Sequence, residues 1–70
     1  MNDPHEHAYV GDLHLEAREA DGWAHSRVET SKTHEQLYMA KSKHLTAVKV
    51  RALAFAQVTD KVEWIVPENG

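Results

Sequence analysis

The fold of this 70-residue chain depends on residues 45–58, which read LTAVKVRALAFAQV. Four alanines and the absence of glycine and proline favour a helix on propensity alone. The periodicity favours a strand, because every second residue from position 48 to position 58 is apolar. A helical period places Lys49 between Leu45 and Leu53 and leaves no continuous apolar stripe. We therefore predict a strand for this segment.

The residues on either side complete the second half of the predicted fold. Residues 59–61 are expected to form a three-residue loop, followed by a last strand at residues 62–66 that pairs with the preceding one. Upstream, Thr33 and Gln36 fit a capping box, in which each side chain satisfies a backbone N–H of the first helical turn. We therefore predict a helix from this point to about His44.

The first half of the chain reads as a β-hairpin. Apolar and polar residues alternate over residues 9–18, which is typical of a half-buried strand. Asp21 and Gly22 then supply the two positive φ angles of a type I′ turn, and a second strand follows at residues 23–29. This turn predicts the cross-strand pairs Leu15–Val28, Glu16–Arg27, Ala17–Ser26 and Arg18–His25.

These elements together predict an α+β fold of order β-β-α-β-β, in which an antiparallel four-stranded sheet packs on one helix. The alternative is a β-hairpin followed by a long helix at residues 33–57 and a C-terminal strand. We expect a single domain at residues 8–67, because a chain of this length cannot divide into two cores. Residues 1–7 are expected to be a disordered arm and residues 68–70 a disordered tail.

The composition narrows the class of protein. The chain has 8 Lys and Arg, 11 Asp and Glu, a net charge of -3 and no cysteine, so disulfide frameworks and thiolate chemistry are excluded. The first seven residues lack the basic and apolar regions of a signal peptide, and no apolar run reaches 18 residues, which favours a cytoplasmic protein. Nucleotide-binding and nucleophile motifs are absent, so we expect neither an enzyme nor a cofactor.

Histidine is unusually frequent, with six residues in 70. His5 and His7 have a chelating spacing, but they fall in the expected arm, where ligands do not converge. His14 and His25 share the outer face of the hairpin without facing each other across the strands. We therefore expect no structured metal site, and a small histidine-dependent metal binder remains a third hypothesis.

Cationic and apolar side chains gather on the predicted outer face of the sheet. Four bases and no acid lie between positions 36 and 59. In the predicted strand, Lys49 and Arg51 lie beside Leu53 and Phe55 on the side away from the helix, and the first hairpin adds further outward residues. The predicted partner-binding residues are Trp23, Arg27, Lys49, Arg51, Leu53, Phe55 and Ile65.

Two functions suit this predicted face. Exposed apolar side chains favour a non-enzymatic module that binds a protein or associates with itself, with an accessory or inhibitory role of the phage or plasmid type suggested by size alone. Cations interleaved with aromatic rings are typical of single-stranded RNA or DNA binding, which is the alternative hypothesis. We expect no membrane partner and infer no small-molecule substrate.

Overall fold

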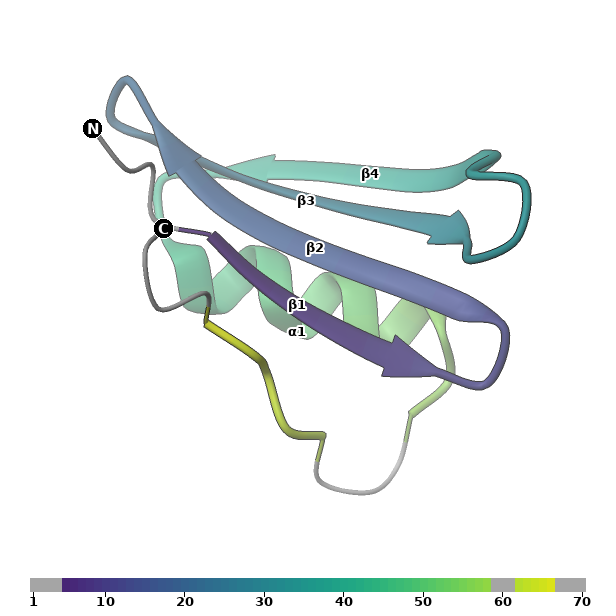
Figure 1. The fold of residues 1–70 in the computed structure, drawn as a ribbon. Helices are drawn as coiled ribbons and strands as arrows, with labels where there is room; N and C mark the ends of the chain where they lie inside the picture. The colour runs from purple at the N-terminus through teal and green to yellow at the C-terminus, as the bar shows by residue number, and fades with distance from the viewer. Residues whose placement is uncertain (1–4, 59–61, 67–70) are drawn as a thin grey trace.

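The computed structural model describes residues 5–58 and 62–66 and shows a four-stranded antiparallel sheet with one helix packed on one of its faces (Figure 1). Neighbouring strands in the sheet are also neighbours in the chain, so the sheet is a simple meander. The elements follow in the order β1 (His5–Val10), β2 (Leu13–Ala20), β3 (Trp23–Thr30), β4 (Gln36–Ser42) and α1 (Leu45–Phe55).

The predicted central hairpin is confirmed. Asp21 and Gly22 have φ angles of 56° and 80°, and they connect β2 directly to β3. The observed register contains every cross-strand pair that the turn predicted. Turn residues with positive φ therefore determined this register locally, because a two-residue turn leaves no freedom in how its strands pair.

The predicted order β-β-α-β-β is wrong, because the structure has the order β-β-β-β-α. The predicted helix from Thr33 to about His44 is a strand, β4, which extends the sheet next to β3. Tyr38 lies opposite Val28 and Ala40 opposite Ser26, so alternate residues of β4 enter the core. Pairing along a whole strand outweighs a capping signal, which stabilises a helix by only about 1 kcal/mol.

The predicted strand at residues 45–58 is also wrong, because residues 45–55 form α1. The alternative of one long helix at residues 33–57 is wrong in its first part, since β4 occupies residues 36–42. In α1 only Val48 and Ala52, one turn apart, are buried, so the helix needs no wide apolar stripe. Helix propensity therefore decides this alanine-rich segment, and the alternation of apolar residues along it has no counterpart in the structure.

The remaining predicted elements differ at their ends. The predicted strand at residues 9–18 is interrupted at Gly11, whose φ of 57° belongs to the turn between β1 and β2. β1 begins at His5 and so includes three residues assigned to the arm. Of the predicted last strand, Ile65 alone makes a β-bridge, to His7. The predicted loop at residues 59–61 and the tail at residues 68–70 lie outside the described residues.

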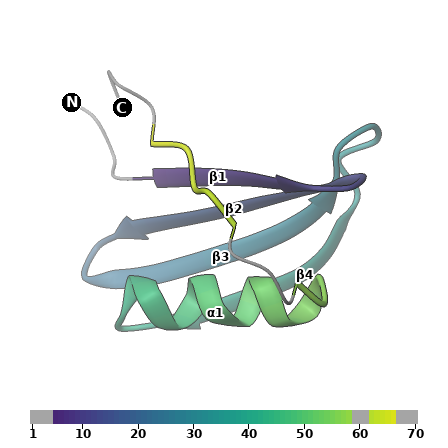
Figure 2. The ribbon, with the colours of Figure 1, turned by 90° about the horizontal axis from the view of Figure 1, so that it is seen from below.

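Figure 2 shows α1 lying along one face of the sheet, and small side chains form much of the contact between them. One buried cluster combines Val48 of α1 with three alanines of the sheet, and Ala52 of α1 joins a second cluster. Trp64 packs against both clusters. Among the described residues, the two clusters therefore lie on the α1 side of the sheet and leave the other side open.

Within the described residues, no helix combines the length and the apolar character that crossing a membrane requires.

Candidate functional site

The sheet face opposite α1 is the candidate functional site, and we call it the open face. Figure 1 shows α1 on one side of the sheet and, among the described residues, no segment covering the other side. Because side chains alternate along a strand, the neighbours of the buried residues point to this face. Its members are His5, His7, Tyr9, His14, Glu16, Arg18, Trp23, His25, Arg27, Glu29, Met39 and Lys41.

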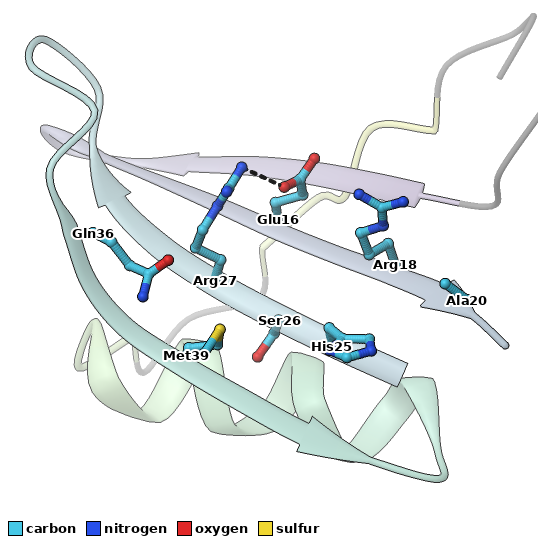
Figure 3. A pocket seen from close by; sticks show the side chains of 8 residues that line it. All are labelled: Glu16, Arg18, Ala20, His25, Ser26, Arg27, Gln36 and Met39. Carbon is cyan, nitrogen blue, oxygen red and sulfur yellow. Dashed lines mark hydrogen bonds and ion pairs between the residues drawn. The ribbon is translucent and has the colours of Figure 1, made fainter. Parts of the chain in front are cut away.

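The open face contains a hollow of about 250 Å³ over β2, β3 and β4 (Figure 3). Arg27 donates a hydrogen bond of 2.8 Å from Nη2 to Oε1 of Glu16 across its rim. Arg18 and His25 lie opposite each other on β2 and β3. Met39, which is 62% exposed, contributes an apolar side chain to the lining of the hollow. The hollow therefore combines cationic, polar and apolar groups at the centre of the sheet.

Beside the hollow, one buried carboxylate organises the imidazoles of the open face. Oε2 of Glu29 lies 2.9 Å from Nδ1 of His14 and 3.0 Å from Nδ1 of His34. Nδ1 of His7 lies 2.8 Å from Nε2 of the His14 ring. Arg27 completes the group, with Nε 3.7 Å from Oε1 of Glu29. The result is a connected chain that links β1, β2, β3 and the loop before β4.

The charge state of Glu29 follows from these contacts. Hydrogen bonds from His34 and then from His14 lower the pKa of the Glu29 carboxyl to about 2, although burial alone would raise it. The carboxylate is therefore ionised at neutral pH and accepts both hydrogen bonds. His14 contacts Glu29 through Nδ1 and His7 through Nε2, so its ring connects these two side chains.

His7 is held as a neutral ring at the far end of this chain. Burial and the neighbouring His14 and His5 lower the pKa of His7 below its usual value, against the opposing charge of Glu16. The His7 ring stacks on the His14 ring with 5.0 Å between centroids, and the Tyr9 ring also stacks on His14, at 4.9 Å. In residues 5–58 and 62–66, no group of three or more His, Cys, Asp or Glu side chains is arranged to hold a metal ion. The imidazoles are engaged with one another and with Glu29.

A turn with a positive φ brings His34 into this group. His34 has a φ of 61°, and its backbone N–H donates to the carbonyl oxygen of Thr30 at 2.9 Å. The hairpin register predicted from Asp21 and Gly22 also places Glu29 opposite His14, as the structure does, whereas the predicted helix contains His34 and the predicted disordered arm contains His7. The sequence signal that could have found His7 is the alternation of His5, His7 and Tyr9, which continues the pattern of the next strand.

Two of the predicted partner-binding residues, Trp23 and Arg27, lie on the open face. The Trp23 ring has the ammonium groups of Lys41 and Lys43 at 4.7 Å and 4.5 Å from its centroid. Arg27 is engaged with Glu16 and Glu29. Both residues are therefore already involved in interactions within the chain.

The other five predicted residues lie elsewhere. Lys49 is on α1, where its ammonium group contacts Glu6 at 2.7 Å and lies 5.0 Å from the centroid of the Trp64 ring. Leu53 packs against the core, and Phe55 stacks on Tyr38 at 4.9 Å between centroids. The remaining two are Arg51, exposed on α1, and Ile65, which bridges to β1. The structure therefore does not bring the seven residues together on one surface.

Comparison with protein-family models, with curated proteins and with solved structures finds no match to this chain. What the protein does is therefore inferred from its own residues.

Proposed function

We propose that the protein is a small non-enzymatic binding module that recognises another protein through the open face, in an accessory or inhibitory role. The observation that supports this proposal is the hollow of about 250 Å³ at the centre of a sheet face that no described segment covers. Met39, which is 62% exposed, lines the hollow, and Tyr9, also 62% exposed, lies on the same face of the sheet on β1. Faces that mix polar groups with a few exposed apolar side chains are typical of protein interfaces, and the hollow is smaller than the roughly 300–1,000 Å³ of small-molecule sites.

The charges of the hollow indicate the chemistry of that partner. Glu16 already accepts a hydrogen bond from Arg27, while Arg18 and Lys41 are the cross-strand neighbours of His25. An acidic side chain placed over His25 would therefore meet cations on both sides. We infer a partner segment that presents an Asp or Glu carboxylate beside an apolar residue able to contact Met39.

The charge distribution does not favour single-stranded RNA or DNA. The bases predicted to form one platform lie on opposite sides of the molecule, and Lys49 is paired with Glu6. The Trp23 ring, which would have to stack on a base, is approached by two lysines of the same chain. A polyanion needs a continuous cationic track with accessible rings.

The proposal also keeps the expected cytoplasmic location, which fractionation of the source cells tests.

Charge reversal at the centre of the hollow tests the proposal. We expect His25→Glu to abolish capture of a specific protein from lysate of the source cells, because it places a negative charge where the partner's carboxylate binds. The control is Val50→Glu, which adds the same side chain at a 58% exposed position of α1 and is expected to retain capture. The captured protein is then purified, and its affinity for both variants is measured by calorimetry.

Two results would reject the proposed function. Release of the partner by nuclease would show that nucleic acid mediates binding, and the salt dependence would then be steep. Equal loss of binding in Val50→Glu and His25→Glu would show that the partner does not use the open face. Unchanged melting temperatures of both variants exclude unfolding as the cause.

A further inference from the structure

The two edges of the sheet differ in how the chain covers them. The β1 edge is met by Ile65, whose N–H and C=O exchange hydrogen bonds of 2.6 Å and 2.9 Å with His7. The β4 edge has β3 as its neighbour on one side, and within residues 5–58 and 62–66 no strand pairs on its other side. Uncovered edges are templates for pairing with another strand.

The hairpin identifies which backbone groups of β4 face outward. A two-residue turn makes its flanking residues, Ala20 and Trp23, a hydrogen-bonded pair, and such pairs alternate along the strands. Odd-numbered residues of β3 therefore bond to β2, and even-numbered residues of β3 bond to β4. By the observed register, the residues of β4 that bond to β3 are Tyr38, Ala40 and Ser42.

The N–H and C=O groups of Met39 and Lys41 consequently point away from the sheet. One of them has a partner in the chain, since Nη1 of Arg51 donates a hydrogen bond of 3.4 Å to the carbonyl oxygen of Lys41. This long contact confirms the outward direction of that carbonyl and is weak enough to be displaced. The register irregularity between Val28 and Glu29 falls at the start of β4 and leaves its centre regular.

Apolar side chains are exposed along the same edge. Met39 is 62% exposed, and Leu37 and Phe55 are each 41% exposed. Phe55 reaches the edge by stacking on Tyr38. Monomeric proteins usually protect such edges with proline, inward-pointing charges or a covering segment. Charged side chains and bulges also protect edges. In the described part of this chain, Lys41 lies two residues after Met39 and the register irregularity lies at the start of β4, so neither is at Met39 itself.

We propose that a second copy of this chain pairs with the β4 edge, antiparallel and about a two-fold axis at Met39. This register is the one that overlaps the whole of β4 with itself and matches outward groups with outward groups. Met39 then faces Met39 of the second copy, and Leu37 faces the aliphatic stem of Lys41. The product is one eight-stranded sheet with two open faces side by side. This interface shares Met39 with the wall of the hollow, but it is formed by the backbone edge of β4 and does not depend on the proposed function.

The charges that flank β4 are complementary in this register. Glu35 precedes the strand by one residue and Lys43 follows it by one. Antiparallel pairing about Met39 places Glu35 of each copy opposite Lys43 of the other, so the symmetry gives two ion pairs. No two like charges face each other along the strand. This self-complementarity favours a second copy over an unrelated strand.

Sedimentation equilibrium of the full chain over a wide concentration range tests the pairing. We expect a reversible monomer–dimer equilibrium whose upper limit is twice the 8.0 kDa of the chain. In hydrogen-exchange NMR, the Met39 amide is expected to exchange more slowly as the concentration rises, whereas the Gly22 amide in the turn is expected not to change. A chain that stays monomeric at every concentration would overturn the proposal.

Matched variants locate the interface. Met39→Lys places two ammonium groups opposite each other and is expected to weaken dimerisation at least about tenfold, whereas Val50→Lys at a comparably exposed position of α1 has no effect. Glu35→Lys and Lys43→Glu are each expected to weaken it about two- to fivefold, and the double variant to restore it. Equal dimerisation by Met39→Lys and the wild type would place the dimer on another surface and reject the proposal. Far-UV circular dichroism confirms that each variant is folded.

Discussion

At the scale of single residues, Glu29 connects side chains from several parts of the open face. Its side chain is buried and accepts hydrogen bonds from His14 and His34. In Glu29→Gln, the uncharged amide is a weaker acceptor, and its NH₂ group brings donors toward these imidazoles and Arg27. We expect the free energy of unfolding to fall by about 1–3 kcal/mol, measured by urea denaturation.

The control for this prediction is Glu16→Gln. Glu16 is also a carboxylate on the open face, but its hydrogen bond to Arg27 is exposed, so we expect a loss below about 1 kcal/mol. Equal losses in the two variants would show that the imidazole contacts of Glu29 contribute nothing to stability.

Gly22 provides a second residue-scale prediction, because its φ of 80° is unfavourable for residues with a Cβ. A Cβ added at Gly22 would meet no atom within 4 Å, so any cost comes from the backbone alone. Gly22→Val is therefore expected to lower the free energy of unfolding by at least about 1 kcal/mol. Gly22→Asn should cost less, since Asn tolerates positive φ. An unchanged urea midpoint for the valine variant would contradict this assignment.

The sequence predicted the residue contacts that depend on local turn chemistry. Asp21 and Gly22 determine the hairpin register, and this register places His14 opposite Glu29. It could not predict the contact of His34, because a histidine with positive φ has no distinctive local pattern. The contact of His7 was missed because a short strand at the end of the chain was interpreted as an arm.

At the scale of elements, the end of α1 gives a stabilising prediction. The N–H of Val58 donates to the carbonyl of Leu53 at 3.0 Å, and the N–H of Gln57 donates to Ala54 at 3.1 Å, which is the Schellman pattern. Gln57 adopts a φ of 58° at the position where glycine is preferred. We expect Gln57→Gly to raise the free energy of unfolding by about 0.5–1 kcal/mol, measured in urea. Gln57→Ala should give no gain, and equal gains in both variants would contradict this explanation.

The exchange of helix and strand between residues 33 and 58 shows where periodicity fails. Residues 36–42 carry a helical capping signal upstream, yet pairing with β3 makes them a strand. Residues 45–55 alternate like a strand, yet α1 buries only Val48 and Ala52 against alanines of the sheet. A small interface of this kind leaves too weak a pattern for periodicity to detect. For residues 36–42 the outcome depends on pairing with β3, which a single sequence does not show, whereas for residues 45–55 helix propensity is the better guide.

At the scale of the whole molecule, the candidate site changed with the fold. Trp23 and Arg27 lie on the open face, as predicted, because both follow from the hairpin register that the turn residues determine. Lys49, Arg51 and Phe55 were predicted to lie beside them, but a helix on the opposite side of the sheet carries all three. The open face was therefore predicted from the sequence in its β2 and β3 part, and its β1 and β4 parts required the structure.

The polar network also makes the stability of the whole molecule depend on pH. The pKa of His7 in the folded protein lies below the usual 6.5, and that of Glu29 is lowered from 4.5 to about 2. In both cases the unfolded chain binds protons at a higher pH than the folded protein does. The free energy of unfolding is therefore expected to fall as the pH decreases.

The two groups act in separate pH windows. The contribution of His7, whose ring faces His5, His14, Glu16 and Arg27, is complete above pH 6.5 and is lost as the pH falls through its lowered pKa. The contribution of Glu29 is complete above pH 4.5 and is lost as the pH falls toward about 2. Thermal unfolding measured across this range is expected to show both declines. His7→Gln should remove the upper decline and Glu29→Gln the lower one, because each variant lacks one titrating group. A wild-type protein that becomes more stable between pH 7 and pH 5, with the rise lost in His7→Gln, would contradict the neutral state of that ring.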